Sequence, residues 1–200
     1  MKFTYLTAAT LLVSVGAFGQ IVAPEADGVY QVRYAANLNF GDSFINFTNT
    51  GVLGGFDPGG NICANVYVID PAQEVVGCCS CPLTPNHLKS ISVRNDLISN
   101  LLTPGVPTSV TVAVLASISC NPAGVNAQNL VRGLKSWGTT IHATPVAGVY
   151  NTTETAFEKS ELSASELSKL TLYCGFIQAN GSGFGICKSC KQGAQGGVKQ

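Results

Sequence analysis

Apolar and polar residues alternate along much of the chain between Gly28 and about Ala116. Side chains of a strand point to alternate faces, so a period near two, or a short β-branched run, predicts strands. The clearest segments are VYQVRYAA, SFINFTNTG, ICANVYVID, EVVGCC, LKSISVRN and SVTVAVLAS, and WGTTIHATPVAGVYNTT adds one or two more. Turns rich in Gly, Pro, Asn and Asp separate them at roughly eight to fifteen residues, which favours an antiparallel β-sandwich of immunoglobulin-like or Greek-key type.

One pair of strands, ICANVYVID and EVVGCCSC, is predicted to form a hairpin around the turn PAQ. Pairing Ile69 with about Val75 places Cys63 opposite Cys81. Because side chains alternate, Cys79 would share the face of Cys81, and Cys78 would point to the other face.

A period of three to four residues appears once, in ELSASELSKLTLYCGFIQANGSG. Ser163 and Glu166 form the S-x-x-E capping pattern of a helix start, which predicts a helix from about Ala164 to Ala179. The apolar stripe of this helix consists of Leu167, Leu170, Cys174 and Ile177. A helix of this length is marginal alone, so we expect it to dock on the sandwich.

The first residues, MKFTYLTAATLLVSVGAFGQ, have the pattern of a secretory signal peptide. Lys2 supplies the positive charge, an apolar run follows from Phe3 to about Val15, and Ala17 and Gly19 are the small residues before the cleavage point. Cleavage is expected after Gly19, with cleavage after Ala17 as the alternative. No later stretch is long and apolar enough to span a membrane. The chain is therefore predicted to be secreted, to the periplasm or to the outside of the cell.

These patterns divide the chain into four parts. Residues 1–19 are the expected signal peptide and residues 20–150 the β-sandwich. Residues 151–190 would form a helix and cysteine clamp packed on the sandwich, and residues 191–200, polar and rich in glycine, a disordered tail.

Composition narrows the functional classes. Charged residues make up 11% of the chain, against about 25% in typical globular proteins, while 46% of residues are hydrophobic. Lys and Arg together number 11, as do Asp and Glu, so the formal net charge is zero and no basic footprint for nucleic acid is present. The sequence contains no EF-hand loop, phosphate-binding loop or nucleophile elbow, so no cofactor and no metal are predicted.

The chain has eight cysteines, an even number that follows an export signal. In an oxidising compartment this pattern predicts four disulfides. The eight are Cys63, Cys78, Cys79, Cys81, Cys120, Cys174, Cys187 and Cys190. The alternative is thiol chemistry or a metal held by the segments CCSC and CKSC.

Eight cysteines allow 105 pairings, so connectivity does not follow from sequence. The expected bridges are Cys63 to Cys81 or Cys79 across the hairpin, one bridge from the C-terminal segment to the CCSC strand, and Cys174 to Cys187, Cys190 or Cys120. Because Cys174, Cys187 and Cys190 are an odd set, at least one of them must pair outside the C-terminal segment.

Four segments, NICANVYVID, CCSCPLTPN, SVRNDLISN and CGFIQANGSGFGICKSC, resemble a group of uncharacterised, predicted secreted, cysteine-rich bacterial proteins. The resemblance covers most of the mature chain, and its cysteine segments are fairly specific. It implies an exported cysteine-rich protein. No activity is assigned to the group, so the resemblance implies no catalytic residue.

No local pattern marks an active site. An exported hydrolase assembled from distant residues would draw on Asp70, Glu74, His87 and His142, although turn positions and exposed strand positions explain all four. The preferred prediction is a non-catalytic exported protein with a binding or structural role. Its partner would be an extracellular glycan, an envelope component or a second copy of the chain.

Overall fold

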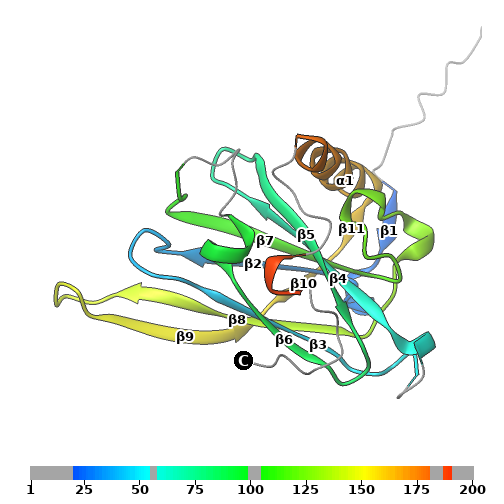
Figure 1. Ribbon diagram of the computed structural model, residues 1–200, viewed down its shortest axis with the longest axis horizontal. Coiled ribbons are helices and arrows are strands. Elements are labelled where there is room, and N and C mark those ends of the chain that lie inside the picture. Colours follow the sequence, from blue (N-terminus) through cyan, green and yellow to red (C-terminus); the bar gives the residue numbers. More distant parts are fainter. Residues whose placement is uncertain (1–19, 55–57, 99–104, 181–186, 191–200) are drawn as a thin grey trace, which may run out of the picture.

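The computed structural model describes residues 20–54, 58–98, 105–180 and 187–190; the expected signal peptide and the expected tail lie outside them. Two antiparallel sheets pack face to face, and a helix covers the other side of one sheet (Figure 1). The predicted mainly-β fold with antiparallel sheets and one C-terminal helix is confirmed. Within the described residues, no helix combines the length and the apolar character needed to cross a membrane.

The larger sheet has the strand order β10-β2-β7-β4-β5, the smaller sheet has the order β6-β3-β8-β9, and β1 pairs with β11. The bounds are β1 Ile21–Ala23, β2 Tyr30–Ala36, β3 Phe44–Asn49, β4 Ile62–Ile69, β5 Val75–Leu83, β6 Leu88–Ser92, β7 Ser109–Ser117, β8 Leu134–Ala143, β9 Tyr150–Ala156, β10 Glu158–Ser160, β11 Leu162–Ser163 and α1 Ala164–Ala179. Short helical turns lie at Glu25–Asp27, Pro58–Gly60, Val93–Leu97, Pro122–Gly124, Ala127–Asn129 and Lys188–Cys190. Strands β9 and β10 thus continue the two sheets beyond residue 150.

The main core lies between the two sheets, because each strand turns alternate apolar residues inward. Its fully buried members include Ala64, Val66 and Val68 of β4, Val112, Val114 and Ala116 of β7, and Ile45 and Phe47 of β3. Cys79 and Cys81 of β5 belong to the same core. Strands β4 and β7 are buried on both faces, which explains why their sequences contain near-continuous apolar runs.

A second core lies between the larger sheet and α1. The helix begins where the sequence predicts, with the Ser163 hydroxyl accepting a hydrogen bond from the Glu166 amide at 3.1 Å. Its stripe of Leu167, Leu170, Cys174 and Ile177 is buried, as expected. From the sheet side Tyr67 fills this core, and its hydroxyl donates to the Pro122 carbonyl at 2.6 Å. Burial raises the pKa of Tyr67 above its ordinary value.

The register of the predicted hairpin differs from expectation. Ile69 does lie opposite Val75, but a β-bulge follows and Val68 pairs with Gly77. The extra residue shifts the remaining pairs by one, so that Cys63 lies opposite Pro82 rather than Cys81. A one-residue shift exchanges the two faces of a strand, which puts Cys63 and Cys81 on opposite faces of the sheet.

Candidate binding face and disulfide cluster

The smaller sheet turns one face toward the core and the other, here called the outer face, away from it. Asn46 of β3 lies opposite Trp137 of β8. Two residues further along, the Phe44 amide donates to the Thr139 hydroxyl at 2.8 Å, and Thr139 lies opposite Glu154 of β9. Residues two apart in a strand share a face, so these five side chains lie on the outer face together.

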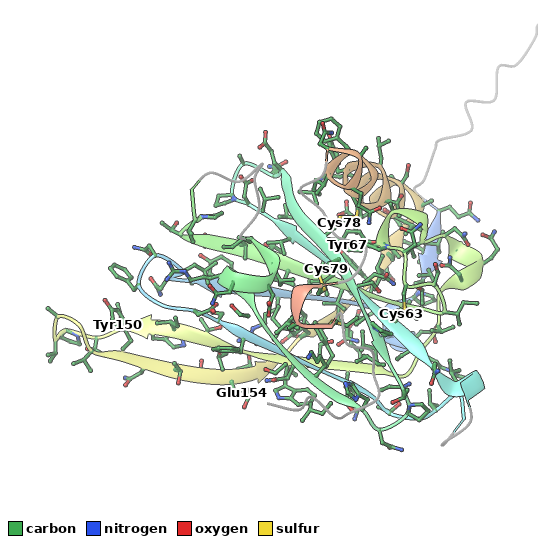
Figure 2. All side chains as sticks on the ribbon, viewed as in Figure 1. Cys63, Tyr67, Cys78, Cys79, Tyr150 and Glu154 are labelled. Atoms are coloured by element: carbon green, nitrogen blue, oxygen red, sulfur yellow. A yellow bond between two sulfur atoms is a disulfide. The ribbon has the colours of Figure 1, made fainter. Side chains whose placement is uncertain are left out.

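Aromatic rings are a prominent feature of the outer face. Phe44 is 47% exposed and Trp137 is partly exposed. Near the hairpin end of β9, Tyr150 stacks on Phe40 with the ring centroids 5.4 Å apart (Figure 2). Tyr150 is six residues along β9 from Ala156, the partner of Trp137, so the aromatic positions extend over about 20 Å.

Hydrogen-bonding groups lie between these rings. The Asn46 amide donates to the Glu154 carboxylate at 2.8 Å, reaching across β8. Thr152, the next outward residue of β9 after Glu154, is exposed. The strand alternation places one cation, Lys135, and one anion, Glu154, on this face among the described strands, so the face is close to neutral.

An arginine anchors the β8–β9 hairpin from the core side. Arg33 of β2 is 8% exposed, and its guanidinium donates to the carbonyl and hydroxyl of Thr155 at 2.6 and 2.5 Å and to the Thr140 hydroxyl at 2.7 Å. The guanidinium also lies 5.9 Å from the ring centroid of Phe157. Burial lowers the Arg33 pKa, and the nearby Glu154 carboxylate opposes that shift. These bonds tie β9 to the larger sheet and give the outer face a fixed shape.

A second exposed apolar surface lies on the other side of the molecule. A groove of about 640 Å³ opens between α1 and the β4–β5 turn, and it is lined by Gln73–Val76 together with Leu172, Tyr173 and Phe176. Leu172 is 70% exposed, Tyr173 48% and Phe176 61%. Because α1 and the smaller sheet lie on opposite sides of the larger sheet, this groove is well separated from the outer face.

All eight cysteines are paired, and three of the four disulfides join β5 to the C-terminal segment. These three are Cys78–Cys174, Cys79–Cys187 and Cys81–Cys190. Adjacent cysteines of β5 point to opposite faces, so Cys78 reaches the helix side while Cys79 and Cys81 reach the main core. Figure 2 labels Cys78 beside α1, to which it is joined through Cys174. The expected C-terminal clamp is confirmed, but the expected pairing of Cys174 with Cys187, Cys190 or Cys120 is wrong.

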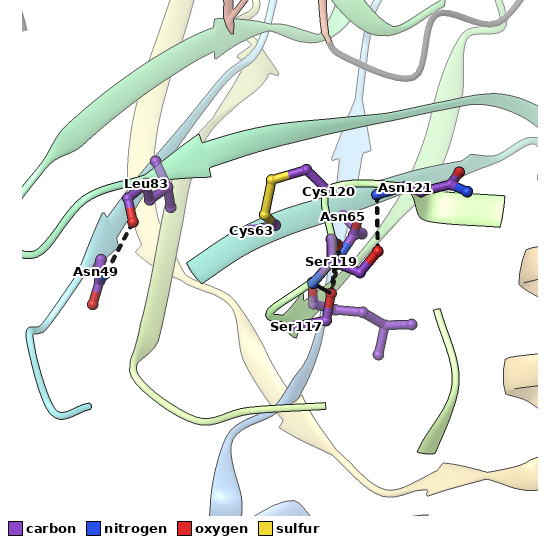
Figure 3. Close-up of a disulfide and its surroundings, with 9 residues drawn as sticks. Asn49, Cys63, Asn65, Leu83, Ser117, Ser119, Cys120 and Asn121 are labelled. Carbon is purple, nitrogen blue, oxygen red and sulfur yellow. Dashed lines mark hydrogen bonds between the residues drawn. A yellow bond between two sulfur atoms is a disulfide. The ribbon is translucent and has the colours of Figure 1, made fainter. Parts of the chain in front are cut away.

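The fourth disulfide joins Cys63 to Cys120, and the expected bridge from Cys63 to Cys81 or Cys79 is wrong. Figure 3 shows this bridge beside a polar network at the end of β7. The Asn65 amide donates to the Ser117 hydroxyl at 2.8 Å, and that hydroxyl donates to the Ser119 carbonyl at 2.7 Å. The network shapes the turn that returns Cys120 to β4.

The CCSC and CKSC segments do come together, as a thiol or metal site would require. The sulfur atoms of Cys81, Cys187 and Cys190 lie within 4.8 Å of one another and are buried. However, Cys81 is bonded to Cys190 and Cys187 to Cys79. Thiolates bind metals and act as nucleophiles, and a disulfide sulfur has no thiolate. In the oxidised protein this cluster therefore consists of structural disulfides.

The hydrolase residues are not brought together. Asp70 and Glu74 lie in the β4–β5 turn, where the Asp70 carboxylate accepts a hydrogen bond from the Glu74 amide at 3.0 Å. The His87 carbonyl accepts from Asn49, which lies opposite Leu134 at the start of β8. His142 lies near the far end of β8, where its ring contacts the Thr153 hydroxyl at 2.8 Å. Eight residues of strand, about 26 Å, separate the two histidine positions.

Desolvation, assisted by nearby Lys89, lowers the pKa of His87.

The residues of the outer face were not singled out by the sequence patterns. One signal was present in SFINFTNTG, because its alternation places Phe44 on the polar side of the strand with Asn46 and Thr48. A single exposed aromatic residue is common on protein surfaces, and only a contiguous exposed patch marks a binding surface, so this signal alone could not have identified the face.

Comparisons with known proteins add little to this description. Neither the family models nor the curated proteins that were searched contain a match. Among solved structures, the crystal structure of Thermotoga maritima 1070 is similar with a TM-score of 0.37 and 8% sequence identity. The match covers 65% of this chain and 97% of the other. A likeness this weak carries no argument about fold or function, so the function is argued from the geometry alone.

Proposed function

We propose that this protein is exported, has no catalytic activity, and binds a neutral glycan on the outer face of its smaller sheet. The observation that carries the proposal is the combination on one face of exposed aromatic rings and neutral hydrogen-bonding side chains. Four disulfides support a location outside the cytoplasm, because such bridges persist in oxidising compartments.

The chemistry of the face fits a sugar polymer. One side of a sugar ring presents C–H groups that pack on an aromatic ring, and its hydroxyl groups exchange hydrogen bonds with amide, carboxylate and hydroxyl side chains. Phe44 and Trp137 supply rings, and Asn46, Glu154 and Thr152 supply polar partners beside them. The near-neutral face favours an uncharged ligand over a polyanion or a polycation.

The dimensions favour a polymer over a single sugar. The aromatic positions extend over about 20 Å from the Trp137 row to Tyr150, a length that several sugar rings would cover. Arg33 and the Asn46–Glu154 bond hold the surface in place before a ligand arrives. A preorganised surface loses less entropy on binding.

The experiment is a co-sedimentation and calorimetry screen of the folded, oxidised protein against insoluble and soluble neutral polysaccharides. Phe44→Ala and Tyr150→Ala should each weaken binding about tenfold, as the loss of one aromatic contact predicts. Tyr173→Ala on α1 is the matched control, because Tyr173 is 48% exposed and Phe44 is 47% exposed. Binding to no neutral polysaccharide, or equal losses for the Phe44 and Tyr173 variants, would refute the proposal. Release of reducing ends from a bound polysaccharide would refute the non-catalytic part.

A further inference from the structure

Strand β9 is the last strand of the smaller sheet, and in the part of the chain that the structure describes no strand lies beyond it. All seven residues from Tyr150 to Ala156 are exposed. An edge strand presents unpaired backbone donors and acceptors, and proteins usually block such edges with proline, lysine, a bulge or a covering segment. β9 contains no proline and no lysine, and it pairs with β8 in an unbroken register.

Other edges of the two sheets are protected. On β5 the Cys187 amide donates to the Ser80 carbonyl, and disulfides attach the C-terminal segment there. β10 is three residues long, and β6 is a five-residue strand with Lys89 near its centre. Figure 1 shows the β8–β9 hairpin extending past the other strands at one end. Among the edge strands of the two described sheets, β9 is therefore the long strand that has none of these protective features.

We propose that β9 is the docking edge for a second copy of this chain, which adds its own β9 in antiparallel orientation across a two-fold axis at Thr153. Thr153 is the central residue of the seven, so an axis there pairs the whole strand with itself. The resulting dimer has one continuous sheet of eight strands.

The side chains complement one another in this register. Tyr150 lies opposite Ala156 of the second copy, which pairs a large residue with a small one, and Asn151 lies opposite Thr155. Thr153 lies opposite its own copy, a threonine pair of the kind that stabilises neighbouring strands. The only charged residue of the strand, Glu154, lies opposite the neutral Thr152. An axis at Glu154 would instead place two carboxylates face to face.

The symmetry favours a second copy over an unrelated peptide. Each favourable pair other than the central one occurs twice, and the partner strand has the same length and the same unbroken extended shape. The strand is also fixed in place before docking, because Arg33 holds Thr155 and the Asn46 amide holds Glu154. Docking therefore requires little ordering of the edge.

The test is sedimentation-velocity centrifugation of the full folded protein and three variants over a wide concentration range. Wild type should change from monomer to twice the monomer mass as concentration rises. Thr152→Glu places one carboxylate opposite each Glu154, at two contacts per dimer, and should raise the dimer dissociation constant about tenfold, whereas Thr152→Lys places an ammonium there and should lower it. Ser90→Glu on β6 is the control, because it adds the same charge to the opposite, exposed edge of the same sheet and should leave the constant unchanged.

Opposite responses at one exposed position separate a register-specific strand pair from general loss of stability. A monomer at every soluble concentration, a dimer that Thr152→Glu leaves intact, or equal weakening by the Glu and Lys variants would overturn the proposal. The result is independent of glycan binding, since the mass of the protein is measured with no ligand added.

Discussion

The three bridges between β5 and the C-terminal segment predict a measurable coupling in stability. The perturbation is removal of the Cys78–Cys174 bridge by Cys78→Ala with Cys174→Ala. It is made once in the wild-type background and once in a background that lacks Cys79–Cys187 and Cys81–Cys190. Both backgrounds lose the same buried sulfur atoms at the same place, so the packing loss cancels when the two costs are subtracted.

The magnitude follows from the lengths of the closed loops. Alone, Cys78–Cys174 closes a loop with a sequence separation of 96, for which loop-closure entropy gives about 4.7 kcal/mol. When Cys79–Cys187 is intact, the path from Cys78 to Cys174 crosses that bridge and shortens to about fourteen residues, which gives about 3 kcal/mol. Removal should therefore cost about 1.7 kcal/mol less in the wild-type background.

The assay is guanidinium unfolding without reductant, followed by the fluorescence of Trp137, the one tryptophan of the chain. Trp137 lies in the smaller sheet, away from α1, so its signal reports unfolding of the sandwich and not detachment of the helix. Equal costs in the two backgrounds, or a larger cost in the wild-type background, would refute the nested-loop reasoning. Such a result would mean that the bridges act mainly through the folded state.

Four further substitutions, one of them a control, test the packing between α1 and the larger sheet. Leu170→Ala should lower the free energy of unfolding by about 2–5 kcal/mol, because the fully buried side chain leaves a cavity, while the exposed Leu172→Ala should stay within about 0.5 kcal/mol in the same denaturant titration. Tyr67→Phe should cost about 1–3 kcal/mol by the same measurement, because the buried bond to the Pro122 carbonyl is lost. Burial, assisted by Glu166, raises the pKa of Tyr30 from 10.0 to about 12. The unfolded chain therefore loses this proton first as pH rises, so stability should fall between pH 10 and 12, and Tyr30→Phe should make that fall less steep.

The elements of the fold were predictable because local signals determine them. Strand periodicity in the segments around β2, β4 and β7 reflects alternate burial, which is a property of each strand alone. The bounds of α1 followed from the Ser163 cap and the apolar stripe, which are also local. These features require no knowledge of which strands are neighbours.

The disulfide pairing was predicted wrongly for an identifiable reason. One bulge residue in the β4–β5 hairpin moved Cys63 to the face opposite Cys81, and the signal beside it, Gly77 inside the strand EVVGCC, is compatible with a bulge but does not fix its position. The true partner, Cys120, reaches β4 through the turn that the Asn65 and Ser117 network shapes. A pairing that depends on one residue of register could not follow from periodicity.

The outer face shows the same limit at the level of function. The sequence placed Phe44 and Asn46 on one side of a strand, but Asn46 meets Glu154 at a separation of 108 residues and lies opposite Trp137 of another strand. Each residue is unremarkable alone, and a binding surface appears only when β3, β8 and β9 become neighbours. The same strand order leaves β9 at the edge of the sheet. The proposed glycan face and the proposed dimer edge therefore both depend on this order, and each of the two experiments tests one of these consequences.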